Sequence, residues 1–452
     1  MGFRKYFPHY RENLKLAIPV IISQVGQTLT GIVDNAMVGH VGKVLLAAAA
    51  FSTSVYHTIV LFGWGFALGL TSLVGNAFGM KDHNKIGRLF RHSLFLNLLM
   101  IIALTGILFI VEMNLYRFGQ DEAVLKEAYP YFRLLTYSFI PHLLFITAKQ
   151  FAEGVASTQP AMVFTILSNL LNIWLNYLLI YGHGGFEPMG LIGAGIATLL
   201  ARVFQAVGMW AYVLFSPRFR PFLISFFERT LEKKLLHEIF TISFPTAVQT
   251  VIEVFAFAFG TIMVGWVGST ELAAHQIALG LVALTFLMSS GFSTAVTIKA
   301  SEFVGAKQIH QARTAVYAGF HLTLLFMSLS AIFFVVFREF LASLHTKDAD
   351  VIMVATHLLM IAAMFQLFDG TQVLALGALR AIVDVKIPTI IVLFCHGLIT
   401  ILVGYVAAFV LGFQEIGIWI GFLSGLATVA VLLMLRFEKA SKKMLKKTVI
   451  FS

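Results

Sequence analysis

Long apolar runs, separated by short polar connections, most constrain what this chain can fold into. Of its 452 residues, 59% are hydrophobic and 12% are charged, with a mean hydropathy of +0.87. Soluble domains carry about 25% charged residues, and a membrane-spanning helix needs about 20 apolar residues. The runs do not alternate in polarity as membrane strands do. The sequence therefore predicts an all-α polytopic membrane protein and excludes an ordinary soluble enzyme.

Reading the apolar runs between polar residues predicts twelve transmembrane helices. The first run is too long for a signal peptide and lacks a small-residue cleavage site, so we expect it to be retained. The predicted spans are 14–38, 46–78, 91–113, 130–150, 159–181, 190–215, 238–262, 272–300, 313–337, 351–378, 386–411 and 415–437.

Lysine and arginine fall mainly on one side of these spans. With the connections numbered by span, 25 lie on the side of both termini and six on the other, and Arg202 lies inside a span. The positive-inside rule then predicts cytoplasmic N- and C-termini and a basic cytoplasmic tail. Because this sorting accounts for the net charge of +10, no nucleic-acid partner is expected.

The chain repeats itself at a constant shift of 226 in residue number. Residues 37–81 and 263–307 share 14 identities in 45 positions without a gap, whereas this composition gives about four by chance. Pro19 and Pro245 have the same shift, and each proline removes a helical hydrogen bond. Such prolines suit a gate or a static kink.

Six spans, an even number, lie within one repeat, so the two halves enter the membrane in the same direction. This predicts two pseudo-symmetric six-helix bundles in a parallel repeat, which is a transporter plan. The predicted domains are an N-terminal lobe over 1–215, a cytoplasmic linker over 216–237 and a C-terminal lobe with a basic tail over 238–452.

Most of the 22 acidic residues fall in loops or at the ends of predicted spans, and three do not: Asp34, Glu253 and Asp369. A carboxylate at mid-depth costs about 2.5 to 3.5 kcal/mol on insertion scales, so each needs a partner or a cavity. Glu253 and Asp369 are the leading candidates for cation binding, including a possible Na+ site. Asp34 is either a third functional acid or a helix-end acid. At the repeat shift Glu253 falls on Gln27 and Asp34 falls on Gly260, so the two halves predict distinct sites.

Polar side chains surround the candidate acids. Amides at helical spacing could complete an oxygen-rich cage or pack at helix interfaces, as is common for amides; these are Gln249, Gln366 and Gln372. A polar stripe in the N-terminal half faces either a wet interior or a neighbouring helix. Ser168, Asn172 and Asn176 form it on the fifth predicted span, with Thr198 on the next span.

The basic groups inside the spans predict structural roles. Arg202 is either a counter-ion or, as we expect, a partner of backbone carbonyls. The histidines lack metal-ligand spacing and are expected to be packed or hydrogen-bonded; they are His57, His142, His275 and His396.

No phosphate-binding loop is encoded, because the glycine segments lack the Lys-Ser/Thr ending, so the sequence implies an energy source other than ATP. The single cysteine, Cys395, excludes a disulfide framework. We predict no cofactor.

Several segments together resemble a known family. Val33 to Gly39, the Glu153-Gly154 loop, the Asn172/Asn176 pair before Ile180-Tyr181-Gly182, Pro245 with Gln249 and Glu253, and Asp369 before Leu376 to Arg380 occur in order over nearly the whole chain. In this spacing they resemble the multidrug and toxic compound extrusion (MATE) transporters, specifically the NorM-type bacterial branch.

The resemblance implies a monomeric exporter in the bacterial inner membrane. It would exchange amphipathic organic cations for Na+ or H+ by alternating access, with cation binding at Glu253 and Asp369 and an N-half ion site around Asp34. Asn176 and Ser168 stand where some relatives have Asp and Asn. In the C-terminal half, Phe365 lies near Asp369 in the sequence, at a position where a tyrosine would support cation binding. The departures at Asn176 and Ser168 weaken the expected N-half cation site.

Other functions fit the architecture less well. A flippase or exporter of a lipid-linked or other amphipathic substrate would call for basic cavity residues, whereas the deep charges are mainly acidic. A membrane enzyme would need a catalytic constellation that is not found, so we predict that the chain is not an enzyme. A channel would need a glycine-rich filter at mid-membrane.

Overall fold

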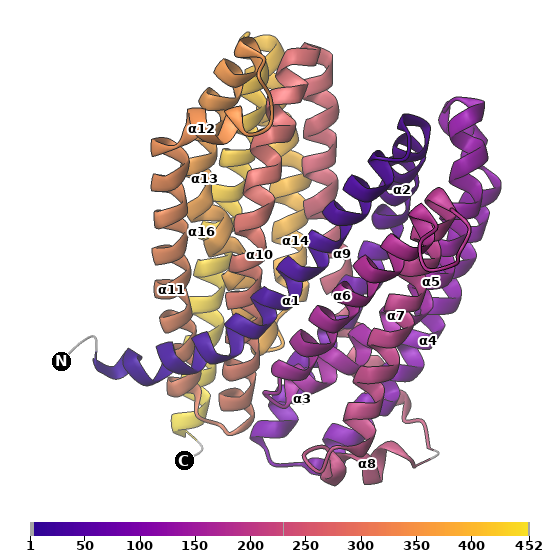
Figure 1. Ribbon diagram of the computed structural model, residues 1–452. Helices are drawn as coiled ribbons and strands as arrows, with labels where there is room; N and C mark the ends of the chain where they lie inside the picture. Colours follow the sequence, from indigo (N-terminus) through magenta and orange to yellow (C-terminus); the bar gives the residue numbers. More distant parts are fainter. Residues whose placement is uncertain (1–3, 229, 451–452) are drawn as a thin grey trace. The chain divides into compact units, whose positions relative to one another are not determined.

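The computed structural model describes residues 4–228 and 230–450, with the side chains of 447–450 left aside, so Arg229 and the Lys447 side chain of the basic side lie outside the described residues. Helices make up almost all of this part, which contains no strand (Figure 1). The helices that form the passes are α1 (Phe7–Gly39), α2 (Lys43–Ala67) with α3 (Gly69–Gly79), α4 (His83–Met113), α5 (Glu122–Gly154), α6 (Gln159–Tyr181), α7 (Gly190–Phe215), α9 (Lys233–Val267), α10 (Ser269–Gly305), α11 (Ile309–Val336), α13 (Ala349–Ala381), α14 (Lys386–Phe394) with α15 (Ile401–Tyr405), and α16 (Gln414–Ile450).

These helices confirm the twelve predicted passes. Eleven are long and apolar enough to cross a membrane by length and composition alone, counting α2 with α3 as one pass and α14 to Val410 as another. The twelfth is α5, whose middle carries Arg133, His142 and two prolines. The Arg133 side chain is balanced by Glu112 of α4, 2.7 Å away.

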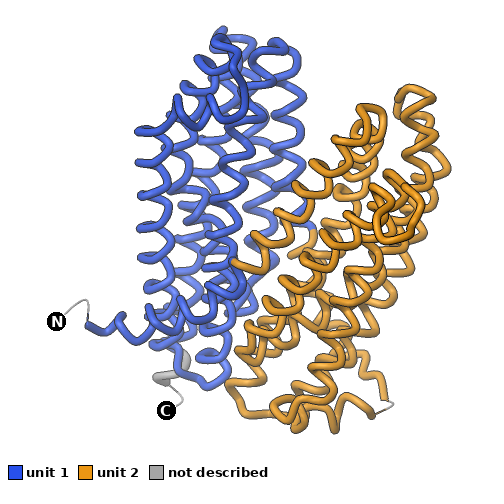
Figure 2. Tube along the Cα trace, in the orientation of Figure 1, with its two compact units in different colours: residues 1–21, 248–452 blue, residues 22–247 orange. Residues whose placement is uncertain are grey.

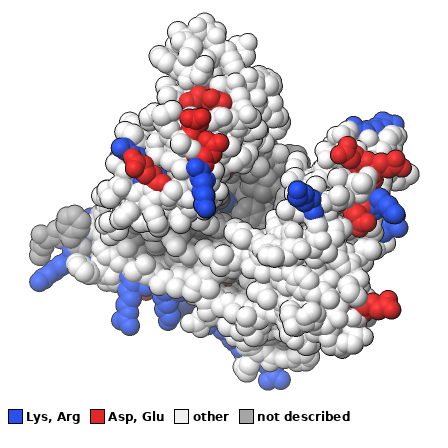
Figure 3. All heavy atoms as spheres, turned by 45° about the horizontal axis from the view of Figure 1, so that its top comes forward, with Lys and Arg blue, Asp and Glu red and all other residues white. Residues whose placement is uncertain are grey.

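Surfaces along the spans are apolar. In α4, only 22% of the apolar window is buried inside the protein, and Ile102, Ile110 and Met113 are each more than 60% exposed. Few charged side chains interrupt the surface drawn in Figure 3. Because burying apolar surface away from water is favourable, such side chains are stable only against lipid.

The chain forms two compact units, coloured separately in Figure 2. Unit 2 comprises residues 22–247, and unit 1 comprises residues 1–21 and 248–452. In unit 1, the N-terminal end of α1 is held to α11, where Asn13 donates to the Ala315 carbonyl at 3.0 Å. The domain limits drawn from the sequence stay a prediction; in the structure α1 and α9 each pass from one unit to the other, just after Pro19 and Pro245.

The internal repeat is visible in the backbone. Lys81 and Lys307, which are related by the repeat shift, both have a positive φ, 57° and 59°. Ala156 and Val383, whose separation is one position larger than that shift, also share this conformation, with φ of 56° and 62°. Left-handed backbone is uncommon for residues other than glycine, so its recurrence in pairs reflects equivalent turns.

One buried hydrogen bond also repeats. Thr71 of α3 donates to the carbonyl of Gln150 at 3.3 Å, and Thr297 of α10 donates to the carbonyl of Gly377 at 3.0 Å. The two donors are related by the repeat shift, and the two acceptors are separated by one position more. The repeat therefore extends to α5 and α13 with an offset of one residue, which sets the equivalent positions used below.

Short helices and irregular turns complete the two units. α8 (Arg220–Phe226) follows α7, and α12 (Arg338–Ser343) follows α11. Two π-helical segments, Cys395–Thr400 and Val406–Val410, interrupt the pass that begins with α14. Hydropathy did not predict these segments, because a π turn changes the hydrogen-bond step without changing composition.

Candidate functional site

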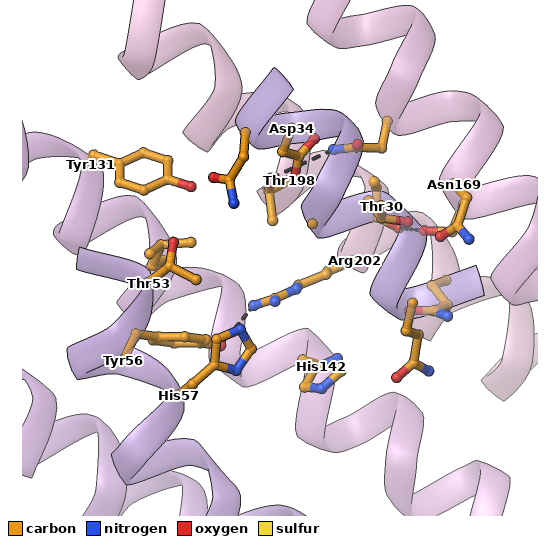
Figure 4. A pocket seen from close by; sticks show the side chains of 18 residues that line it. Thr30, Asp34, Thr53, Tyr56, His57, Tyr131, His142, Asn169, Thr198 and Arg202 are labelled. Carbon is orange, nitrogen blue, oxygen red and sulfur yellow. Dashed lines mark hydrogen bonds between the residues drawn. The ribbon is translucent and has the colours of Figure 1, made fainter. Parts of the chain in front are cut away.

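A cavity of about 190 Å³ lies inside unit 2. Side chains from α1, α2, α5, α6 and α7 line it, and Figure 4 shows them converging. Among them are four of the predicted site residues, Asp34, Ser168, Asn172 and Thr198. The helix passes thus bring together an acid from the first predicted span and the polar stripe of the fifth.

Asp34 is held by a chain of amides. Asn176 of α6 donates to the Asp34 carboxylate at 2.5 Å and to the Asn172 side-chain oxygen at 3.3 Å. Asn172 in turn donates to the Thr198 hydroxyl at 3.5 Å. Hydrogen bonds to a carboxylate favour its charged form and fix its orientation. The acid therefore faces the cavity in a prepared position.

The polar stripe of α6 serves both roles considered from the sequence. Ser168 donates to the Ala201 carbonyl of α7 at 2.9 Å, which joins two helices. Ser168 and Asn172 also line the cavity, whereas Asn176 is fully buried behind Asp34. A polar stripe in a membrane can therefore pack on one side and face a wet space on the other.

Arg202 extends from α7 across the cavity (Figure 4). Its guanidinium donates to the Tyr56 hydroxyl at 2.6 Å and to the Ser138 hydroxyl at 2.7 Å, and it lies 5.4 Å from the Tyr56 ring centre. The prediction that Arg202 pairs with backbone carbonyls is wrong, because its guanidinium donates to side-chain hydroxyls of α2 and α5 instead. The cavity therefore contains one fixed cation and one fixed anion.

Several lining residues were missed from the sequence. His57 and His142 were predicted to be packed side chains, yet both line the cavity beside Arg202. Tyr56, Tyr131 and Gln205 line it as well. Gln205 lies two helical turns after Thr198, which was a usable signal. The tyrosines gave none, because aromatic residues are common throughout this chain.

The acids of the second half lie within unit 1. Gln372 of α13 donates to the Glu253 carboxylate of α9 at 2.8 Å. The side-chain oxygen of Gln372 lies 3.1 Å from the His396 ring in the first π-helical segment. Gln372 therefore links the Glu253 carboxylate to a histidine.

Asp369 is almost completely buried, with 2% exposure, and its Oδ2 atom has no hydrogen-bond partner among the described residues. Glu253 lies within electrostatic reach of both Asp369 and Arg380. Arg380 was counted on the basic side from the sequence. Arg380 therefore interacts with Glu253, whereas the charged neighbour of Asp369 is Glu253 itself.

The other two candidate amides contact different groups. Gln249 donates to the Thr389 hydroxyl at 2.8 Å and to the Val385 carbonyl at 3.2 Å. Gln366 donates to the Thr285 hydroxyl at 2.8 Å. Helical spacing placed these amides near the acids in sequence, but their side chains bind helices α14 and α10.

Within the described residues, no group of three or more His, Cys, Asp or Glu side chains is arranged to hold a metal ion. A Na+ ion at Glu253 and Asp369 would need further oxygen atoms, such as the Gln372 side chain. The role of every candidate site residue stays a proposal.

The fold and these two acid-bearing regions define a helical membrane protein built from a duplicated six-pass unit. The MatE family model matches residues 19–178 and again residues 245–406, so the two matches begin at the two prolines that the repeat shift relates. The chain belongs to the MatE family of membrane transporters.

Curated relatives support the same placement. The chain is 32% identical over 433 residues to the multidrug resistance protein NorM of Photobacterium profundum, covering 95% of both chains. It is 33% identical to a probable multidrug resistance protein NorM of Pasteurella multocida, covering 97% of this chain and 96% of that one. It is 30% identical to the multidrug resistance protein MdtK of Yersinia pseudotuberculosis, with 97% coverage of each. The chain is thus of the NorM type.

Solved structures share the fold. A MATE transporter in the bent conformation has a TM-score of 0.90 at 20% identity, with 99% of each chain covered. The eukaryotic MATE transporter AtDTX14 has a TM-score of 0.86 at 20% identity, covering 98% of this chain and 100% of that one. The all-α architecture with twelve passes is therefore that of MATE transporters.

Proposed function

We propose that this protein is a secondary active transporter that exports amphipathic organic cations in exchange for Na+ or H+ by alternating access. The names of the NorM and MdtK relatives support multidrug export. The observation that carries the coupling proposal is the pair Glu253 and Asp369: the half-buried Glu253 lies within electrostatic reach of the buried Asp369, and Arg380 lies near Glu253. A cation or proton binding there relieves the cost of two nearby negative charges.

In the proposed cycle, the transporter open to the outside takes up Na+ or H+ at Glu253 and Asp369. Neutralising these acids lowers the affinity of the protein for the drug cation, which leaves. The coupling ion then drives the return to the inward-open state and is released inside. Exchange results because each ligand prefers a different state of the same protein.

Asp34 is proposed as the acid of a second site in unit 2. It is already bonded to Asn176, and it shares its cavity with Arg202. A carboxylate near a fixed cation binds a further cation less strongly than an isolated one. Unit 1 is therefore the better candidate for coupling.

The test is uptake of a fluorescent cation into proteoliposomes, under an imposed Na+ gradient and, separately, a pH gradient. Glu253→Gln and Asp369→Asn should each reduce gradient-driven transport at least about tenfold, because each removes a titratable carboxylate. Glu339→Gln, an exposed acid of α12, is the matched control and should transport as the wild type does.

The two gradients also identify the coupling ion. A response to Na+ at constant pH assigns Na+, and a response to pH without Na+ assigns H+. Transport that ignores both gradients and both substitutions would overturn the proposed exchange.

A flippase for a lipid-linked or other amphipathic substrate is the second candidate, because Arg202 places a cation inside the cavity. Among the described residues that line the cavity, Arg202 is the only Arg or Lys side chain. A diphosphate head group carries more negative charge than one arginine balances, which favours the organic cation. Scrambling of a labelled polyprenyl diphosphate in the same vesicles would support the flippase instead.

Placement in the cell follows from the distribution of charge. We propose that both termini face the cytoplasm from a bacterial inner membrane, because 25 basic residues lie on their side. We propose a monomer as the working unit. Cysteine labelling of single sites at Lys126 and Lys439 from outside intact cells would test the orientation, since only the former should react.

A further inference from the structure

A second cavity lies at the end of unit 1, away from the buried acids. Its volume is about 250 Å³, and it forms between the turn that follows α13 and the C-terminal end of α16. The turn contributes Ile382 and Asp384; α16 contributes Arg436, Lys439, Ala440, Lys443 and Met444.

The charges in this cavity do not cancel. Arg436 is paired with Asp384, with 2.6 Å between Nε and Oδ2. Lys439 and Lys443 line the same cavity, are exposed, and have no acidic side chain within 4.0 Å among the described residues. Four residues apart on one helix, they point to the same side. The cavity therefore has two uncompensated positive charges one helical turn apart.

Exposed apolar side chains continue from the cavity along α16. Leu432 lies one turn before Arg436, and Leu435 lies one turn before Lys439. They are 37% and 60% exposed. On α14, which packs against α16, Ile387 and Ile390 are also exposed, at 40% and 65%. A cationic pocket thus adjoins an apolar surface.

This combination matches one kind of ligand. A soluble phosphate would use the lysines but leave the apolar surface uncovered, and an acyl chain alone would leave the lysines uncompensated. Basic pockets where helices leave the membrane bind anionic lipid head groups, and each Lys or Arg contributes to the attraction.

We propose that this cavity binds an anionic phospholipid, with its phosphate between Lys439 and Lys443. The acyl chains lie along Leu432 and Leu435 of α16, against α14. The Arg436–Asp384 ion pair forms the floor of the site and holds the turn after α13 to α16. This site is independent of the proposed transport cycle and is defined by the chain's own residues.

The experiment measures lipid binding to the purified full chain by native mass spectrometry. The probes are phosphatidylglycerol, phosphatidylcholine with the same acyl chains, and soluble glycerol phosphate as a competitor. The test variant is the double substitution Lys439→Gln with Lys443→Gln. The matched control is Lys442→Gln with Lys446→Gln, which removes the same charge from the same helix. Lys442 is paired with Glu438 at 2.9 Å, and neither control lysine lines the cavity.

Wild type should bind phosphatidylglycerol at least about tenfold more tightly than phosphatidylcholine. The test variant should weaken phosphatidylglycerol binding about tenfold, and the control should change it less than about twofold. A third variant, Lys439→Arg with Lys443→Arg, keeps both charges and should bind as wild type does, which separates loss of the site from loss of folding.

Three results would overturn the proposal. Equal weakening by the test and control variants would mean that only the total charge of the helix matters. Equal affinity for the two lipids would remove the role of the lysines. Full displacement of the lipid by equimolar glycerol phosphate would identify a site for a free phosphate rather than a lipid.

Discussion

The two halves of the protein place different residues at equivalent positions. In unit 2 the first helix of the repeat carries Asp34 above a cavity, and the equivalent residue of unit 1 is Gly260. A Cβ atom on Gly260 would lie 2.2 Å from the Phe422 ring, which is itself 2% exposed. An aromatic ring therefore fills in unit 1 the space around the position that holds an acid in unit 2.

At the positions equivalent to the two acids of unit 1, unit 2 has no acid. Glu253 is equivalent to Gln27, and with the one-residue offset seen in the backbone Asp369 is equivalent to His142. Gln27 and His142 both line the cavity of unit 2. The same framework thus carries two acids in one half and an amide and a histidine in the other. Duplicated folds can diverge in charge while keeping their backbone turns.

The largest expected effect tests whether the acids of unit 1 are the coupling site. Asp369→Asn should lower gradient-driven transport at least about tenfold, whereas Asp34→Asn should lower it only about threefold, because Asp34 is already bonded to Asn176 and shares its cavity with Arg202. The assay is initial uptake in proteoliposomes. Equal losses in the two variants would mean that the halves contribute alike.

The next effect concerns Gly260. Gly260→Ala should destabilise the protein by about 1 to 3 kcal/mol, because the added methyl group overlaps Phe422 in a packed interior. The measurement is unfolding of the detergent-solubilised protein. Gly280→Ala is the control, since no atom lies within 4 Å of its added Cβ. If both alanines are tolerated equally, Phe422 does not close this space.

Removing the cation of unit 2 should make the two halves more alike. Arg202→Met leaves Asp34 without a neighbouring positive charge, so the affinity for a monovalent organic cation should rise about threefold to tenfold. Equilibrium binding of tetraphenylphosphonium measures this. Tyr56→Phe keeps the charge and removes one hydrogen bond, so its affinity should stay near that of wild type. Weaker binding by Arg202→Met would contradict the assigned role.

The smallest effect tests what the halves share. Thr71→Val and Thr297→Val each remove a buried hydroxyl that donates to a carbonyl of the neighbouring helix at equivalent positions, so each should cost about 0.5 to 1.5 kcal/mol. The Thr71 hydroxyl also contacts the Gln150 side chain, and the Thr297 hydroxyl also contacts the Ser293 carbonyl of its own helix. Thermal unfolding of both variants in the same detergent provides the comparison. Thr294→Val is a control, because that hydroxyl donates to the Ser290 carbonyl of its own helix. If only one of the two variants loses stability, the two repeated hydrogen bonds contribute unequally to the free energy of unfolding.

Much of the fold was predictable because spans depend on composition over many residues. Twelve passes, their parallel repeat and the prolines at the same shift are visible in the sequence. The breaks were not predictable: Leu68 separates α2 from α3, and π turns begin at Cys395. Hydropathy measures transfer from water to lipid, and it is insensitive to which carbonyl a backbone amide reaches.

The sites were predictable in part. Acids stand out in an apolar chain because their burial is expensive, so Asp34, Glu253 and Asp369 were found directly. Their partners were less visible. Helical spacing placed Gln366 and Gln372 beside Asp369, but their amides reach other groups: Gln372 donates to Glu253, and Gln366 donates to Thr285. Spacing specifies the face of one helix, whereas contact depends on which neighbour packs against that face.

By itself, the sequence determined that this chain lives in a membrane, crosses it twelve times and carries a few deep acids in two non-identical halves. These properties follow from local composition and from repeats that need no knowledge of contacts. Only the tertiary structure decided that Arg202 shares a cavity with Asp34, and that Phe422 fills the corresponding space beside Gly260. The physical reason is that a cavity is the space left by side chains distant in sequence, and close packing decides which of them fill it.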